Sequence, residues 1–146
     1  DPLVREGVAY VVTYQGEMAA VSIDTGVVLW RRKLSSYAGL GADFRQLYVS
    51  DAEDFVWAID PRNGSALWKN EKMRYRKLSA PAVVGRYVVV GDFEGYLHWL
   101  GQDDGQLLGR VRVGKSSITA APIVKDGVAY VYADGGEIVA VTTLNK

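Results

Sequence analysis

A segment of about forty residues recurs along the chain and constrains the fold more than any other feature. Tyr10, Tyr48, Val89 and Tyr130 serve as anchors, separated by 38, 41 and 41 residues. Glycine recurs sixteen positions after the first three anchors, and a glycine or Asp54 stands six positions after every anchor. Coincidences at fixed offsets indicate copies of one supersecondary unit. We place the repeats, within one domain over 1–146, at residues 2–39, 40–80, 81–121 and 122–146.

Each repeat has the pattern of short strands joined by turns. The anchors lie in apolar runs such as 87–90, with turn residues on both sides, which is typical of buried strands. A second strand follows, for example 18–23, and then a polar turn with aspartate and glycine. A third strand ends near Trp30, and we expect a fourth, outer strand before the next repeat, for instance at 74–78. Four antiparallel strands in forty residues predict an all-β fold of propeller blades.

Composition supports this fold class and excludes several functions. Valine occurs 21 times and tyrosine 9 times, and both favour strands. Basic and acidic residues both number 17, so the chain lacks the positive excess of a dedicated nucleic-acid binder. The absence of cysteine excludes disulfides and thiolate sites, and the single His98 excludes a site built from several histidines. No apolar run approaches the roughly 20 residues that cross a bilayer.

The repeat count predicts an incomplete ring. Three complete repeats and a partial fourth make about three and a half blades, whereas propellers usually close with four to eight. Open blade faces and strand edges favour pairing with another chain. We therefore expect the chain to be part of a larger ring and, when isolated, to form a homo-oligomer.

The second turn of the repeat resembles that of the pyrroloquinoline-quinone (PQQ) propeller superfamily. The string runs Ala20-x-x-x-Asp24-Thr25-Gly26-x-x-x-Trp30, and a related string ends at Trp68. The resemblance implies that each tryptophan packs between neighbouring blades. The residues that we assign to the structural repeat are Gly26, Trp30, Gly64, Trp68, Gly95, Gly105 and Gly136.

A narrower resemblance lies in the third repeat. The string from Gly91 to Trp99, Gly-Asp-Phe-Glu-Gly-Tyr-Leu-His-Trp, is similar to the BamB family of the outer-membrane β-barrel assembly machinery. The order of repeats matches roughly the last 40% of that family, whose eight-bladed ring is closed by N-terminal residues. The resemblance implies a scaffold without catalytic residues, cofactor or metal.

The same resemblance implies a location and partners. The parent would be a lipoprotein on the periplasmic face of the outer membrane of a Gram-negative bacterium, held by an N-terminal lipid, and the fragment itself would be soluble. It would bind BamA-type periplasmic domains, and unfolded outer-membrane proteins are a further class of partner. Within this chain, Arg74, Arg76 and Lys77 are the candidate partner-binding residues, because they follow Trp68 and because the similarity to the BamB family begins at Arg76, in the stretch 76–81 that leads into the string.

Other interpretations of these residues remain open from sequence alone. The PQQ repeat also occurs in quinoprotein enzymes, and in sensor or structural propellers of unknown ligand, because a fold does not determine an activity. Asp103-Asp104 and Asp51-x-Glu53-Asp54 could serve as paired acid and base groups, but their glycine-adjacent positions favour turn residues. His98 has the pattern of a packing or surface residue, and Trp57 and Trp99 that of core or channel-lining residues. Arg31-Arg32-Lys33 and the cations at 72–77 favour a solvated outer strand.

Overall fold

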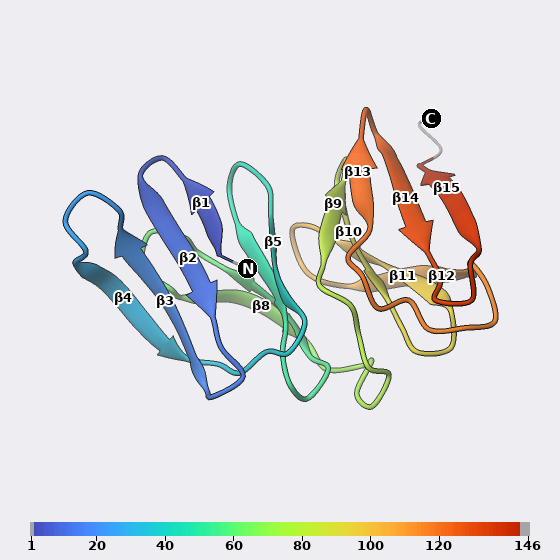
Figure 1. Cartoon of the computed structure of the whole chain (residues 1–146), viewed down its shortest axis with the longest axis horizontal. Coiled ribbons are helices and arrows are strands. Elements are labelled where there is room, and N and C mark those ends of the chain that lie inside the picture. Colours follow the sequence, from blue (N-terminus) through green and yellow to red (C-terminus); the bar gives the residue numbers. More distant parts are fainter. Residues whose placement is uncertain (1, 144–146) are drawn as a thin grey trace.

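The computed structural model describes residues 2–143, and these form fifteen strands in four antiparallel sheets without a helix (Figure 1). The first sheet contains β1 (Leu3–Arg5), β2 (Val8–Val12), β3 (Glu17–Ser22) and β4 (Val28–Lys33). The second contains β5 (Gly39–Ala42), β6 (Leu47–Ser50), β7 (Val56–Ile59) and β8 (Ala66–Asn70). The third contains β9 (Ala82–Val84), β10 (Tyr87–Gly91), β11 (Tyr96–Gly101) and β12 (Leu107–Arg112). The fourth contains β13 (Ile123–Lys125), β14 (Val128–Tyr132) and β15 (Ile138–Thr142).

These sheets confirm the prediction of an all-β protein with about three and a half blades. Within each sheet the strands pair in chain order, so every connection inside a blade is a hairpin. The pairing register shifts between Ala20 and Val21, between Ala58 and Ile59, and between Trp99 and Leu100. A bulge at the same place in three blades shows that the sequence repeat is also a repeat of backbone geometry. Residues 144–146 of the last predicted repeat, and residue 1, lie outside the described residues.

The prediction of a fourth strand at 74–78 was wrong. The fourth strand of each blade precedes the anchor strand, as β9 precedes β10, and residues 71–81 form the connection between blades. This connection turns at Met73, whose carbonyl oxygen accepts the Arg76 N–H at 3.1 Å, and both Tyr75 and Lys77 have positive φ angles. The error arose because β1, β9 and β13 have only three residues each, too few to show an alternating pattern.

The hydrophobic core lies between the sheets in three layers. Side chains alternate across each strand, so Tyr48 of β6 points toward the third blade and Val49 toward the first. Between the third and fourth blades, Leu97 of β11 meets Val131 of β14. Burying one such side chain stabilises the fold by about 1.5–3 kcal/mol. Because every layer joins two blades, the sheets stabilise each other.

The repeated tryptophans join adjacent blades at the outer strands. Trp30 of β4 donates its Nε1–H to the Pro61 carbonyl oxygen at 2.9 Å, and Trp68 of β8 donates to the Gln102 carbonyl oxygen, also at 2.9 Å. Each acceptor lies in the turn that precedes the outer strand of the following blade: Pro61 between β7 and β8, and Gln102 between β11 and β12. The glycine of that turn lies against the indole ring: a Cβ atom on Gly64 would stand 2.5 Å from Cε3 of Trp30. The glycine therefore leaves the space that the tryptophan occupies.

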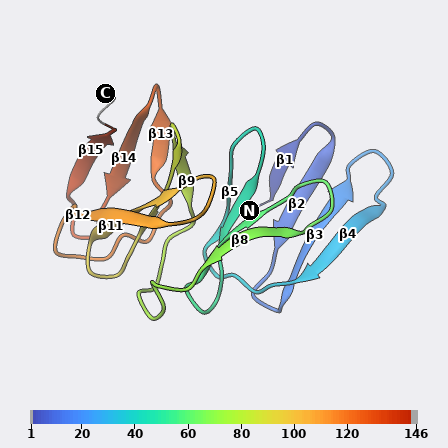
Figure 2. The same ribbon diagram turned by 180° about the vertical axis from the view of Figure 1, so that it is seen from behind.

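The two terminal blades each expose one apolar face. Val4 of β1 is 62% exposed, and on the last blade Ile123, Tyr130, Tyr132 and Ile138 are exposed. These blades lie at opposite ends of an open row of sheets, and Figure 2 shows the same row from behind. Exposed apolar faces of this kind mark surfaces that associate with another protein surface.

Candidate functional site

Loops from all four blades meet at one end of the molecule, the lower end in Figure 1, which we call the loop end. It comprises the connections between blades, at 34–38, 71–81 and 113–122. It also comprises the turns that follow the anchor strands β2, β6, β10 and β14, at 13–16, 51–55, 92–95 and 133–137. Three equivalent hydrogen bonds join each turn to the connection seventeen positions earlier: Ala52 N–H to Ser35 O (2.7 Å), Phe93 N–H to Arg76 O (3.0 Å) and Asp134 N–H to Ser117 O (2.8 Å). The loop end is therefore held by the backbone itself.

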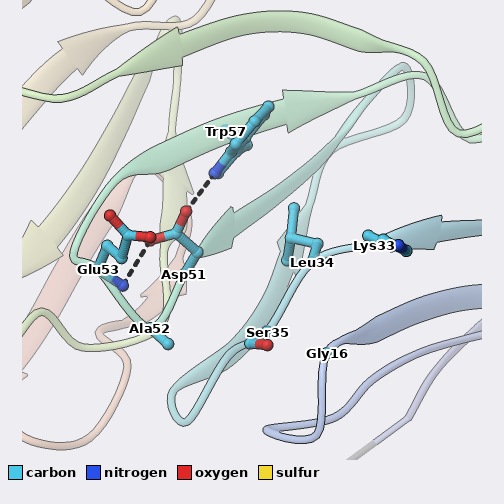
Figure 3. Close-up of a pocket in the computed structure, with 8 residues that line it drawn as sticks. All are labelled: Gly16, Lys33, Leu34, Ser35, Asp51, Ala52, Glu53 and Trp57. Atoms are coloured by element: carbon cyan, nitrogen blue, oxygen red, sulfur yellow. Dashed lines mark hydrogen bonds between the residues drawn. The ribbon is translucent and has the colours of Figure 1, made fainter.

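A small cavity of about 330 Å³ lies between the first and second blades at this end (Figure 3). Gly16, Lys33, Leu34 and Ser35 line it from the first blade, and Asp51, Ala52, Glu53 and Trp57 from the second. Asp51 Oδ1 accepts the N–H groups of Glu53 and Phe55 at 2.8 and 2.9 Å, and its Oδ2 accepts Trp57 Nε1–H at 2.7 Å. Both oxygens of this carboxylate are thus engaged within the chain, as the prediction of a turn residue expects.

A larger groove of about 740 Å³ crosses the second and third blades. Five loops contribute to it, with Tyr37, Tyr75 and Phe93 as its aromatic side chains and Lys77 as its cation. Asp51 and Asp54 also line the groove. Asp54 Oδ1 accepts the Leu78 N–H at 2.9 Å, so this carboxylate too is engaged by the chain. The size is that of grooves that hold small ligands or short peptides.

A buried charge network of Arg76, Asp92 and His98 lies next to the groove residue Phe93. Asp92 is fully buried, and its Oδ1 accepts the N–H groups of Glu94 and Tyr96 at 2.9 and 3.0 Å. Its Oδ2 accepts Arg76 Nε–H at 2.7 Å and lies 2.6 Å from His98 Nε2. Burial alone would raise the pKa of Asp92, but these hydrogen bonds, that from His98 first, lower it to about 2.

The position of His98 differs from the prediction of a lone packing or surface residue. It is buried and bonded to a carboxylate that stands six positions earlier in the sequence. The Asp51–Trp57 pair has the same separation and the same contact in the second blade. This recurring separation was the sequence signal that could have revealed the network. Trp57 and Trp99 are both partly buried and pack against the core layers, Trp57 under the guanidinium of Arg32.

The three candidate partner-binding residues have different environments. Arg74 is exposed, lies over the Tyr75 ring at 5.1 Å and pairs with Glu53 at 3.5 Å. Arg76 forms ion pairs with Asp92 at 2.7 Å and with Glu94 at 3.1 Å. These contacts hold the connection 71–81 in place. Lys77 is exposed, and its ammonium has no hydrogen bond or ion pair with any residue that the structure describes.

The outer edge of the third blade carries a second group of cations. Arg110 and Arg112 of β12 lie over the Tyr96 ring, with 4.1 and 4.9 Å between each guanidinium carbon and the ring centroid. Both arginines are exposed, and neither pairs with a carboxylate within residues 2–143. The edge of β12 thus combines free positive charge with a strand that has a neighbour on one side only.

Asp103 and Asp104 both lie in the turn between β11 and β12. Asp104 Oδ1 accepts the Gln106 N–H at 2.9 Å, and Asp103 pairs with Arg45 at 3.2 Å, so both are turn residues. Within the described part of the chain, no three residues among His, Asp and Glu converge on a point where a metal ion could bind. The same part contains no helix that is long and apolar enough to cross a membrane.

Comparison with known proteins identifies the family. The sequence profile of the family described as outer membrane protein assembly factor BamB matches residues 1–70 and 56–145. The chain belongs to the BamB family. BamB of Pseudomonas aeruginosa is 46% identical over 133 residues, or 91% of this chain and 35% of that protein. BamB of Alkalilimnicola ehrlichii is 41% identical over 140 residues, or 96% of this chain and 37% of that protein.

A solved structure agrees. The crystal structure of BamB from Moraxella catarrhalis superposes with a TM-score of 0.87 at 28% identity, over 95% of this chain and 41% of that one. The chain spans little more than a third of the length of the curated BamB relatives above. Those relatives are named for outer-membrane protein assembly, which agrees with the narrower of the two resemblances seen in the sequence.

Proposed function

We propose that this chain forms part of a non-catalytic scaffold for the assembly of outer-membrane proteins. The observation that carries the proposal is the similarity to proteins named as outer membrane protein assembly factors over more than nine-tenths of the chain. The packed sheets and the bonded loop end support it, because they form a rigid surface for partners. The parent would be a periplasmic lipoprotein on the inner face of the outer membrane, with unfolded outer-membrane proteins among its partners.

The partner within the assembly machinery is a BamA-type periplasmic domain, and the edge of β12 suits it. Val113 N–H donates to Gly95 O at 2.7 Å, which makes Leu97 and Val111 the next bonded pair of this antiparallel ladder. The backbone groups of Arg110 and Arg112 therefore point away from the sheet. A strand of a mixed α/β domain can add to such an edge through these groups, and the free arginines favour acidic side chains on it.

The test compares Arg110→Pro with Arg110→Ala. Proline is tolerated where the N–H faces solvent, but it removes one donor that an added strand needs, whereas alanine removes only the charge and the stacking on Tyr96. Binding of a BamA-type periplasmic domain, measured by calorimetry, should weaken with alanine and weaken by a further factor of about 5–10 with proline. Equal affinity of the two variants would contradict edge pairing.

The isolated 146-residue chain should also associate with itself. Its two terminal blades expose apolar faces of the kind that meet between blades elsewhere in the fold, and such faces are the surfaces that oligomers bury. Sedimentation should show a discrete species of two or three copies. A single species near 16.0 kDa at all concentrations would show that the exposed apolar faces of the terminal blades do not drive self-association.

A further inference from the structure

The exposed aromatic residues of the loops are concentrated at the loop end. Tyr37 is 79% exposed, Tyr75 77% and Phe93 42%, and these three line the large groove. Tyr14 stacks on Tyr37 beside it, with 6.1 Å between ring centroids. Exposed tyrosine and phenylalanine side chains are typical of surfaces that bind another chain, because they bury a large area with little loss of side-chain entropy.

The loop that presents two of the groove residues has a strained backbone. Tyr75 has a φ angle of 68° and Lys77 one of 52°, in the left-handed region that costs non-glycine residues about 1–3 kcal/mol each. Arg76 between them is fixed, since its side chain bonds the buried Asp92 and its carbonyl oxygen accepts the Phe93 N–H. The network thus holds the Tyr75 and Lys77 side chains at the groove, and such strain is typical of binding sites.

One charged side chain of the groove, Lys77, is available to pair with a ligand. Asp51 and Asp54 already accept hydrogen bonds from the chain's own N–H groups. Lys77 has no such partner among residues 2–143. A carboxylate that enters the groove next to Lys77 can therefore pair with an ammonium that has no other partner among the described residues.

We propose that this groove binds an extended segment of an unfolded chain, with an aromatic side chain among Tyr37, Tyr75 and Phe93 and a carboxylate at Lys77. The proposal rests on the proposed function, because strands of outer-membrane barrels alternate in polarity and carry aromatic residues at both ends. The groove lies on the second and third blades, away from the two exposed terminal faces. Self-association through those faces would leave it open.

The test uses a labelled synthetic peptide of about nine residues, the length of a barrel strand. Apolar and polar residues alternate in it, and it ends in phenylalanine with a free carboxylate. One control peptide has serine in place of every aromatic residue, and another has an amidated end. The proposal predicts saturable binding of the first peptide by fluorescence anisotropy, weaker binding of the amide, and loss of binding with the serine peptide. Equal binding of the aromatic and serine peptides would overturn it.

Variants of the full chain locate the site. Tyr75→Ser and Phe93→Ser should each weaken peptide binding by about tenfold or more, and Lys77→Gln should weaken the free acid while leaving the amide unchanged. Phe44→Ser is the matched control, because Phe44 is 85% exposed in the β5–β6 turn, outside the groove. An equal loss in Phe44→Ser would overturn the proposal. Thermal melting of each variant establishes that it folds.

A BamA-type domain, titrated in parallel, separates this inference from the proposed function. If the domain binds and the peptide does not, the groove proposal fails and the scaffold proposal stands. If the peptide binds and the domain does not, the groove proposal stands and the assignment of that partner fails. If Tyr75→Ser abolishes binding of the domain and leaves the peptide unaffected, the groove is a docking site for the folded domain, and our proposal is wrong.

Discussion

Substituting Gly105 and Gly26 by alanine tests whether the tryptophan–glycine contact couples the blades. The two glycines occupy equivalent turns with nearly equal φ angles, 70° and 72°. They differ in their neighbours: a Cβ on Gly105 would overlap the Trp68 ring, whereas one on Gly26 meets no heavy atom of the described residues within 4 Å. Gly26 belongs to the first blade, which has no preceding tryptophan in this chain.

The expected magnitudes follow from two separate costs. The left-handed backbone costs alanine about 1–2 kcal/mol at either site. Overpacking against Trp68 adds about 1–3 kcal/mol at Gly105 alone. Gly26→Ala should therefore lower the free energy of unfolding by about 1–2 kcal/mol, and Gly105→Ala by about 2–5 kcal/mol.

Urea denaturation followed by tryptophan fluorescence measures both variants. A double variant, Gly105→Ala with Trp68→Leu, completes the cycle, because removing the ring removes the overlap and makes the two costs non-additive. Equal destabilisation by Gly26→Ala and Gly105→Ala would refute the reasoning, as would strict additivity in the double variant.

Three further outcomes follow from the same contacts. The pKa of Asp92 is depressed from 3.8 to about 2 in the folded chain, so its contribution to stability should be complete above pH 4 and disappear as the pH falls to 2. Measuring the unfolding midpoint as a function of pH checks this, and an Asp92→Asn variant should lose the pH dependence. Trp68→Phe should cost about 1–3 kcal/mol in urea unfolding, since the Gln102 carbonyl oxygen loses the shorter of its two hydrogen bonds and keeps only the 3.4 Å bond from Gln46 Nε2. Arg76→Gln should cost about 1.5–3 kcal/mol and accelerate proteolysis within residues 71–81, whereas unchanged cleavage would show that Arg76 does not hold that loop.

The sequence was sufficient for the parts of the fold that repeat. Fixed offsets located the anchor strand and the strand after it in all four repeats, and the strand that contains Trp30, Trp68 or Gly109 in the first three, because a propeller builds the same hairpins from the same pattern. The repeated backbone geometry includes Asp54, which occupies the position held by glycine in the other repeats and has a φ angle of 64°. Aspartate is among the residues that tolerate this conformation best.

The parts that do not repeat were beyond a sequence pattern. The groove draws its residues from five loops far apart in the chain, and only the stacking of blades brings them together. The Arg76–Asp92–His98 contacts depend on the pairing of Val90 with His98 across β10 and β11. The repeat led Arg76 to be interpreted as part of an outer strand, because the inner strand that completes each blade is too short to be recognised.

Amide hydrogen exchange on this chain, with and without a BamA-type periplasmic domain, tests the scaffold proposal most directly. The N–H groups of Arg110 and Arg112 point away from the sheet and should exchange rapidly in the free chain. If a partner strand adds to β12, these two amides become protected when the domain binds, while the amide of Val111, already bonded to β11, changes little. Unchanged exchange at Arg110 and Arg112 in the presence of saturating domain would contradict the account.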